Sequence, residues 1–127
     1  QGKSVELVLT LGTGVGSAVY VGGTLLPNLE LGHAPFKGKL TYEDYLCDAQ
    51  LKRIGHKKWR RRVRIVVDQL QPIWNYRLLY LGGGNSRLLK PDDLPGNARI
   101  APNTAGLTGG LSLWRDVDCA GPEAIPA

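Results

Sequence analysis

The chain of 127 residues contains no methionine and only two cysteines. Because translation begins with methionine, we expect Gln1 to follow a further upstream segment of the natural protein. Cys47 and Cys119 lie far apart and outside any Cys-x-x-Cys spacing. This argues against a disulfide framework or a cysteine metal site and predicts two reduced thiols.

Long apolar runs are also missing. No stretch approaches the ~20 apolar residues that span a bilayer, and the N-terminus has no basic-then-apolar signal segment. We therefore expect a soluble, cytoplasmic protein without membrane contact. The length suits one domain with a sizeable core, and the small residues and prolines near the end predict a flexible tail over residues 115–127.

Alternating glycines follow an apolar stretch near the N-terminus. Residues 5–11 alternate as in a strand, and Ser17 to Val21 predict a second strand, so Gly12, Gly14 and Gly16 fall in a hairpin. The hairpin has no lysine and no following helix. This excludes a Walker loop and a dinucleotide fingerprint.

This hairpin has two interpretations. Glycines let backbone N–H groups converge on an oxyanion, and the Thr13 hydroxyl can donate to the same oxygen, which predicts a phosphate site at Gly12, Thr13, Gly14 and Gly16. The alternative is a tight turn that needs only positive φ angles, as we expect for Gly22 and Gly23 at the next bend.

The rest of the chain predicts an α/β fold in which a three-stranded meander is followed by helices and two further strands. A helix capped by Thr41 has Asp44 at its N3 position. A longer helix runs from His56 to Gln71 and is ended by Pro72. The remaining predicted features are a strand over 24–26, a polar loop over 35–39, a strand over 77–81, a short helix capped by Asn85 and Ser86, a strand over 98–101 and a last helix over 104–114.

Apolar residues indicate how the helices pack. The first helix has an apolar face of Tyr42, Tyr45, Leu46 and Ala49. The core face of the longer helix is formed by residues at helical spacing, namely Trp59, Val63, Val66, Val67 and Leu70.

Three motifs in chain order carry a family resemblance. They are Leu-Thr-Leu-Gly-Thr-Gly-Val-Gly-Ser at 9–17, Pro-Asn-Leu-Glu-Leu-Gly-His-Ala-Pro-Phe at 27–36 and the triple glycine at 82–84. Over residues 5–114 the chain resembles the C-terminal half of ROK-family sugar kinases, most of all the polyphosphate glucokinase branch. The resemblance implies half of an actin-like ATPase (ribonuclease H-like) fold.

The resemblance also implies site residues. It assigns the donor phosphate to Gly12, Thr13, Gly14 and Gly16, and glucose or a similar hexose to Glu30 and His33. A carboxylate accepts hydrogen bonds from sugar hydroxyls, and an imidazole can donate or accept beside it. The nucleotide of an ATP donor would lie against Gly82, Gly83, Gly84 and Asn85.

Two departures from the family pattern limit what this chain can do alone. The cysteine-rich zinc loop is missing after His33, so we expect no zinc. The general-base aspartate of the family belongs to its N-terminal half, so we expect no catalytic residue here and no kinase activity from these residues alone. Mg²⁺ would arrive with the donor, which is polyphosphate or ATP.

Eight of the sixteen basic residues lie between Lys52 and Arg64. One interpretation is a solvated surface, with Trp59 in the core. A second is a surface that binds polyphosphate and includes Lys57, Lys58, Arg61 and Arg62. A third, which fits the family less well, is a nucleic-acid surface with Trp59 available for stacking on bases.

Two further alternatives stay open at this stage. The chain could be the sugar-sensing half of a ROK-type transcriptional repressor, or a non-catalytic homologue. An isolated half would also expose an apolar cleft wall through which two copies could form a homodimer.

Overall fold

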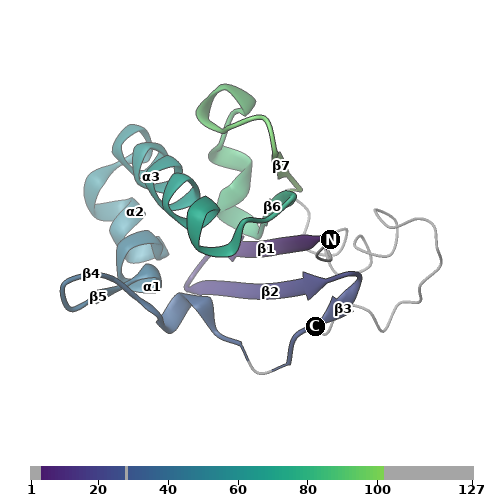
Figure 1. Ribbon diagram of the computed structural model, residues 1–127. Helices are drawn as coiled ribbons and strands as arrows, with labels where there is room; N and C mark the ends of the chain where they lie inside the picture. The colour runs from purple at the N-terminus through teal and green to yellow at the C-terminus, as the bar shows by residue number, and fades with distance from the viewer. Residues whose placement is uncertain (1–3, 28, 102–127) are drawn as a thin grey trace.

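The computed structural model describes residues 4–27 and 29–101 (Figure 1). A five-stranded sheet has the order β3-β2-β1-β6-β7. Its strands are β1 (Val5–Leu11), β2 (Val15–Val21), β3 (Thr24–Leu25), β6 (Leu78–Gly82) and β7 (Ala98–Ile100). The first three strands form the predicted antiparallel meander, and β6 and β7 add parallel to it.

The register sets which strand ends meet. Thr10 of β1 pairs with Gly82 of β6 in the parallel ladder, and Leu11 pairs with Val15 across the β1–β2 hairpin. The carboxyl ends of β1 and β6 therefore lie side by side. The glycine hairpin and the triple glycine leave the sheet from the same edge, where open α/β sheets place their ligands.

Three helices cover one face of the sheet, and they are α1 (Tyr42–Leu46), α2 (Asp48–Ile54) and α3 (His56–Trp74). The predicted core face of α3 is confirmed, because Trp59, Val63, Val66, Val67 and Leu70 are all buried. They join Leu7, Leu9 and Leu11 of β1 in the main core, whereas Val8, Tyr20 and Tyr80 form a small cluster on the opposite face.

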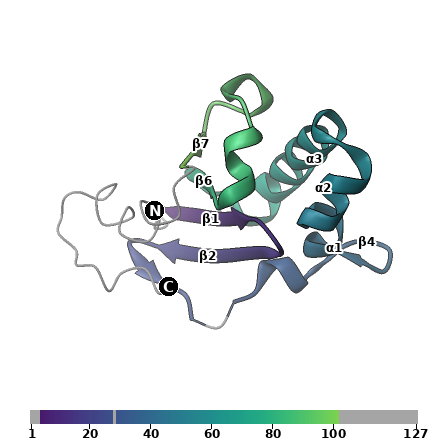
Figure 2. The ribbon, with the colours of Figure 1, turned by 180° about the vertical axis from the view of Figure 1, so that it is seen from behind.

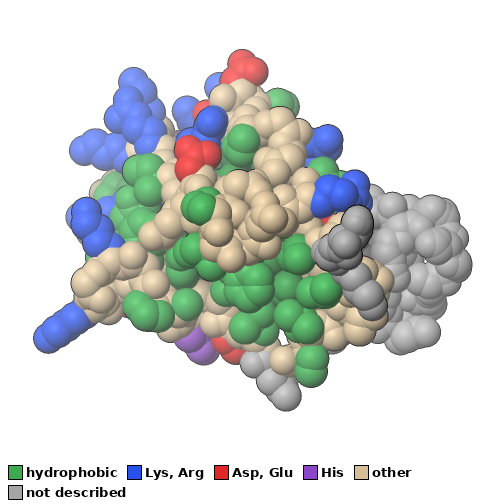
Figure 3. Space-filling view, in the orientation of Figure 1, with side chains coloured by type: hydrophobic (Ala, Val, Ile, Leu, Met, Phe, Trp, Pro, Cys, Tyr) green, Lys and Arg blue, Asp and Glu red, His purple; other side chains and the backbone are tan. Residues whose placement is uncertain are grey.

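The outer face of α3 and α2 is basic. In the space-filling view, Lys and Arg side chains gather over these two helices (Figure 3). Burial of Trp59 at 0% exposure, with its indole N–H donating to the Leu46 carbonyl at 3.0 Å, shows that Trp59 is not available for stacking on a nucleic acid.

Two predicted boundaries are wrong. Pro72 does not end α3, which continues to Trp74 and closes with the Asn75 N–H donating to the Gln71 carbonyl. Proline removes one helical hydrogen bond, but its fixed φ is compatible with a helix, and only two residues of α3 follow Pro72. The helix predicted over 42–49 is two helices, because Cys47 has extended backbone angles.

The segment predicted as a polar loop over 35–39 contains the strand β4 (Pro35–Lys37), which pairs with β5 (Leu40–Thr41). Phe36 stacks on Tyr45 with ring centroids 4.5 Å apart, so packing on α1 orders this segment. The capping of α1 is confirmed, because Thr41 and Asp44 form a reciprocal capping box.

Short 3₁₀ helices complete the described chain: η1 (Leu31–His33), η2 (Gly84–Leu88) and η3 (Pro91–Asp93). Viewed from both sides, the tip of the β1–β2 hairpin lies beside α1 and α2 (Figures 1 and 2). The predicted helix over 104–114, the tail over 115–127 and Cys119 lie outside the described residues. Within 4–27 and 29–101, no helix is both long and apolar enough to cross a membrane.

Candidate functional site

The loop that joins β1 and β2 contains two neighbouring amides without a hydrogen-bond partner among the described residues. The Gly12 N–H donates to the Gly14 carbonyl at 3.1 Å, and the Val15 N–H donates to Glu43 Oε1 at 3.1 Å. Between them, neither the amides of Thr13 and Gly14 nor the Thr13 hydroxyl hydrogen-bond to any residue that the structure describes. Consecutive free amides in a turn are a type of backbone feature at which proteins bind anions.

A turn that needs only positive φ angles does not explain these glycines. None of Gly12, Gly14 and Gly16 has a positive φ, whereas Gly22 and Gly23 do, at 58° and 85°. The alternative of a simple positive-φ turn is therefore wrong for the first bend and right for the second.

Gly16 has a packing role that its sequence motif did not indicate. It lies within β2 opposite Thr10, and a Cβ at this position would collide with the Thr10 hydroxyl oxygen. The lack of a side chain at Gly16 makes room for Thr10. A direct contact between Gly16 and phosphate stays a prediction.

Two residues that the sequence analysis missed hold the hairpin from outside. Glu43 of α1 accepts the Val15 amide, and its Oε1 lies 2.8 Å from where a Cβ on Gly14 would stand. The backbone N–H of Asp48, the first residue of α2, donates to the Gly12 carbonyl at 3.0 Å. No local sequence pattern signals either contact, since Glu43 is 28 residues from its partner.

This arrangement predicts opposite results for two substitutions of Glu43. Glu43→Ala releases the Val15 amide and should weaken binding of inorganic tripolyphosphate about tenfold, as loss of one part-buried hydrogen bond implies. Glu43→Gln keeps an oxygen acceptor but removes a negative charge beside the anion. Without Mg²⁺ it should bind tripolyphosphate at least as tightly as the wild type, by isothermal titration calorimetry. Equal losses in both variants would contradict a positioning role for the carboxylate oxygen.

The segment 30–33 packs directly on the strand that follows the hairpin. A Cβ on Gly32 would collide with the Val15 carbonyl oxygen, so only glycine permits this approach. Ser17 Oγ accepts the Leu31 N–H at 2.9 Å and fixes the same segment to β2. The predicted sugar-binding motif therefore lies beside the predicted phosphate hairpin.

Within that segment, Glu30 precedes η1 and His33 is its last residue. Both residues are exposed, and neither side chain hydrogen-bonds or forms an ion pair with a described residue. Their polar atoms are thus available to a ligand. Solvent alone would satisfy them equally well, so their role as sugar ligands stays a prediction.

The triple glycine divides into packing and exposed positions. Gly83 has a φ of 86°, and a Cβ there would stand 2.5 Å from the Leu11 carbonyl oxygen and 2.6 Å from its nitrogen. Gly82 and Gly83 are buried, whereas Gly84 is exposed. The first two glycines allow the end of β6 to lie against the backbone of β1.

The prediction that Asn85 and Ser86 cap the helix after the triple glycine is wrong. η2 begins after Gly83 without a side-chain cap, and the Ser86 hydroxyl instead donates to the Gly83 carbonyl at 2.7 Å. Asn85 turns toward α2, where its Nδ2 donates to Asp48 Oδ1 at 3.2 Å. Asp48 therefore contacts the hairpin through its backbone and the triple-glycine segment through its side chain.

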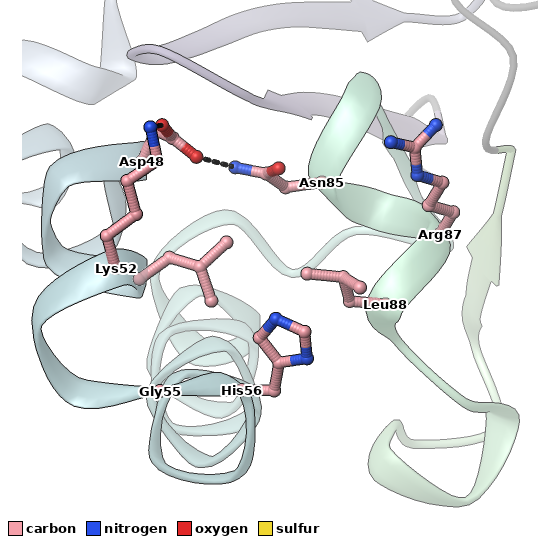
Figure 4. Close-up of a pocket in the computed structure, with 8 residues that line it drawn as sticks. Asp48, Lys52, Gly55, His56, Asn85, Arg87 and Leu88 are labelled. Carbon is pink, nitrogen blue, oxygen red and sulfur yellow. Dashed lines mark hydrogen bonds and ion pairs between the residues drawn. The ribbon is translucent and has the colours of Figure 1, made fainter.

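A hollow of about 460 Å³ opens beside this contact, between the α2–α3 junction and η2. Figure 4 shows the Asp48–Asn85 pair at one side and the His56 ring pointing toward Leu88 at the other. Hydrogen bonds from Lys52 and Asn85 hold the pKa of Asp48 below its usual value. Of the predicted nucleotide residues, only Asn85 lines this hollow.

No cluster of three His, Cys, Asp or Glu side chains suited to a metal occurs in the described part of the chain. The groups beside the hairpin are nevertheless hard oxygen donors, namely the Thr13 hydroxyl and the Glu43 carboxylate. Such oxygens are the ligands that Mg²⁺ accepts together with phosphate.

The predicted polyanion residues are not equivalent. Lys57, Lys58 and Arg61 are exposed and have no hydrogen-bond or ion-pair partner among the described residues. Arg62 instead donates to the Tyr45 carbonyl at 2.9 Å, and its guanidinium lies 4.3 Å from the centre of the Tyr45 ring. Arg62 therefore holds α3 against α1.

Comparison with known proteins gives these contacts a family context. No family model matches the chain. A polyphosphate glucokinase of Mycobacterium tuberculosis is 37% identical over 113 residues, which cover 81% of this chain and 42% of the relative. Over the matched residues, the chain is homologous to part of the polyphosphate glucokinases. It spans less than half the length of this curated relative.

Solved structures agree with the sequence match. An inorganic polyphosphate/ATP-glucomannokinase from Arthrobacter sp. strain KM superposes with a TM-score of 0.67 at 28% identity, over 79% of this chain and 41% of that one. A ROK hexokinase from Thermus thermophilus gives 0.60 at 21% identity, over 84% of this chain and 55% of that one. The predicted ROK-type, actin-like fold is therefore confirmed for this polyphosphate glucokinase homologue.

Proposed function

We propose that the chain is the donor-phosphate-binding and sugar-binding portion of a glucokinase-type sugar kinase, which transfers a phosphoryl group from polyphosphate or ATP to the 6-hydroxyl of glucose. The observation that carries this proposal is the pair of unpartnered amides at Thr13 and Gly14, held beside the segment 30–33 by the Gly32–Val15 contact. Homology to polyphosphate glucokinases supports it.

In this proposal the hairpin positions the donor. The amides of Thr13 and Gly14 and the Thr13 hydroxyl donate hydrogen bonds to oxygens of the transferring phosphoryl group, where negative charge spreads in the transition state. These donors sit on a turn fixed from both sides by Glu43 and Asp48, so they need little reorganisation. Mg²⁺ carried with the donor would supply further positive charge.

In this proposal the sugar binds at the segment 30–33, which packs on β2 beside the hairpin. Glu30 accepts hydrogen bonds from two sugar hydroxyls, and His33 binds a neighbouring hydroxyl. The proton of the 6-hydroxyl passes to an aspartate that we assign to a segment outside these 127 residues. The chain then contributes binding and orientation, which lower the barrier only when the base is also present.

The identity of the donor depends on the group attached to the gripped phosphate, which is either a nucleoside or further phosphate. Asn85 would contact a nucleotide bound in the hollow beside η2, which it lines. The Arthrobacter protein is named for both polyphosphate and ATP. We propose the same pair of donors here.

Two measurements on the chain test this function together. A coupled glucose-phosphorylation assay should show no turnover with either donor, because we assign the general base to a segment outside these 127 residues. Millimolar glucose should nevertheless raise the apparent Tm, since a ligand of the native state stabilises it. Glu30→Ala should abolish the rise, whereas Glu43→Gln should keep it. Turnover by the chain would refute the assignment of the base elsewhere, and a Tm unaffected by glucose would refute the sugar site.

A further inference from the structure

The basic face of α3 has a charge pattern that the proposed hairpin site does not explain. Lys57, Arg60, Arg61 and Arg64 follow the spacing i, i+3, i+4, i+7 and so form one stripe along the helix. We call these four residues the α3 stripe. It lies on the side of the helix away from the buried face that contains Trp59 and Val63.

Part of this charge is already neutralised within the protein. Arg60 pairs with Asp93 at 3.4 Å, and Arg64 pairs with Asp68 at 3.0 Å. Lys57 and Arg61 have no such partner among the described residues, and they are one helical turn apart. Like charges at this spacing destabilise a helix, and cations near its N-terminus oppose the macrodipole. A bound anion relieves both costs.

The α3 stripe lines a hollow of about 320 Å³, and Asp92 and Asp93 line it as well. A second hollow, the one lined by Lys52 and His56, begins at the residue next to Lys57. Asp48 lines that second hollow and donates its backbone N–H to Gly12 of the hairpin. Lys52 and Arg87 also line this second hollow, and Lys52 pairs with Asp48 at 3.1 Å, so two further cationic side chains lie on the side of the stripe that faces the hairpin contact.

The chemistry of this surface favours an anion without bases. Proteins that bind single-stranded nucleic acid combine cations with exposed aromatic rings on which bases stack. Here Trp59 is fully buried, and the large exposed hydrophobic side chains of the described residues are all leucine or isoleucine: Leu26, Leu40, Ile65 and Ile73. The stripe offers charge and no stacking platform.

We infer that the α3 stripe, with Lys58 beside it, is a second anion site that binds the body of an inorganic polyphosphate chain away from the transferred end. The inference rests on the proposed function for its choice of ligand. Lys57 and Arg61 would then give the protein a preference for long over short polyphosphate chains, because only a long polymer contacts both the stripe and the hairpin. Tripolyphosphate reaches the hairpin alone.

A pair of matched double variants tests the site in the full 127-residue chain. Lys57→Gln with Arg61→Gln should weaken binding of long-chain polyphosphate about tenfold or more. It should also make the slope of log affinity against log salt less negative by about 1 to 2, as expected when two cations stop contacting an anionic polymer. Lys37→Gln with Lys39→Gln removes the same charge from the β4–β5 hairpin and should change affinity less than twofold.

Three outcomes are decisive. Equal losses in both double variants, or a single-stranded DNA of equal charge that binds the wild type as tightly as polyphosphate, would overturn the inference. Unchanged polyphosphate binding in Lys57→Gln with Arg61→Gln would do the same. Tripolyphosphate binding separates this result from the hairpin proposal, because it should respond to Glu43→Ala and not to the α3 variants.

Discussion

We expect Gly83→Ala to lower the free energy of unfolding by about 3 kcal/mol or more, since it combines overpacking with a strained backbone. The added Cβ would stand 2.5 Å from the Leu11 carbonyl oxygen and 2.6 Å from the Leu11 nitrogen. Both atoms belong to the backbone of β1, which is paired on both sides and has little freedom to move. The φ of 86° adds strain for any residue with a side chain.

Gly84→Ala is the matched control for this substitution. The adjacent glycine has no atom within 4 Å of an added Cβ and no positive φ. Its substitution should change stability by less than about 1 kcal/mol, in the range of ordinary surface changes. Urea unfolding followed by circular dichroism measures both variants. Similar midpoints for Gly83→Ala and Gly84→Ala would contradict the described contact between β6 and β1.

Gly32→Ala should strongly weaken glucose binding and should affect tripolyphosphate binding at the hairpin much less. The new Cβ would collide with the Val15 carbonyl oxygen of β2, and the short segment η1 is the part that can move. Moving it displaces Glu30 and His33 together. Glucose affinity should fall about tenfold or more, because small misplacements of ligand groups have large effects on binding sites.

Gly96→Ala controls for the loss of a glycine, since nothing lies within 4 Å of a Cβ at that position. Glucose-induced thermal shifts report the sugar affinity, and calorimetry with tripolyphosphate reports the hairpin. We expect Gly96→Ala to bind both ligands as the wild type does. Normal glucose binding by Gly32→Ala would show that Glu30 and His33 do not depend on this contact.

Several elements could be predicted from local sequence because their signals are local. Alternation along residues 5–11 predicts the strand β1, and helical spacing along α3 reflects its one buried face. Both elements are confirmed, although Val8 is buried on the opposite face of the sheet. The meeting of the hairpin and the triple glycine was not predicted, because no local pattern shows that β1 and β6 pair in parallel. Parallel strands present their carboxyl ends at one edge, and Thr10 pairs with Gly82 there.

The features that the sequence did not predict depend on contacts between residues that are distant in the chain. Phe36 orders the β4–β5 pair by packing on Tyr45, and Glu43 reaches Val15 across 28 residues. Neither partner is visible in a local window. The end of α3 was mispredicted for a different reason. A proline usually breaks a helix, but Pro72 lies inside the last turn of α3, which ends two residues later at Trp74.

The glycines illustrate a limit of interpreting a motif as a ligand contact. Gly12 precedes the two amides that have no partner among the described residues, and Gly14 carries one of them, as a phosphate site requires. Gly16 and Gly83 instead make room for Thr10 and for the backbone of Leu11. Both kinds of glycine lie at the same edge of the sheet, and the sequence does not separate those beside unpartnered amides from those that allow close packing.

The most direct measurement is a ¹H–¹⁵N NMR titration of the chain with tripolyphosphate in the presence and absence of glucose. The amides of Thr13 and Gly14 should show the largest saturable shifts with tripolyphosphate, and Leu31 and Gly32 the largest with glucose, each ligand still binding when the other is present. Shifts that leave residues 12–15 unchanged, or mutually exclusive binding of the two ligands, would contradict a donor hairpin beside a sugar segment.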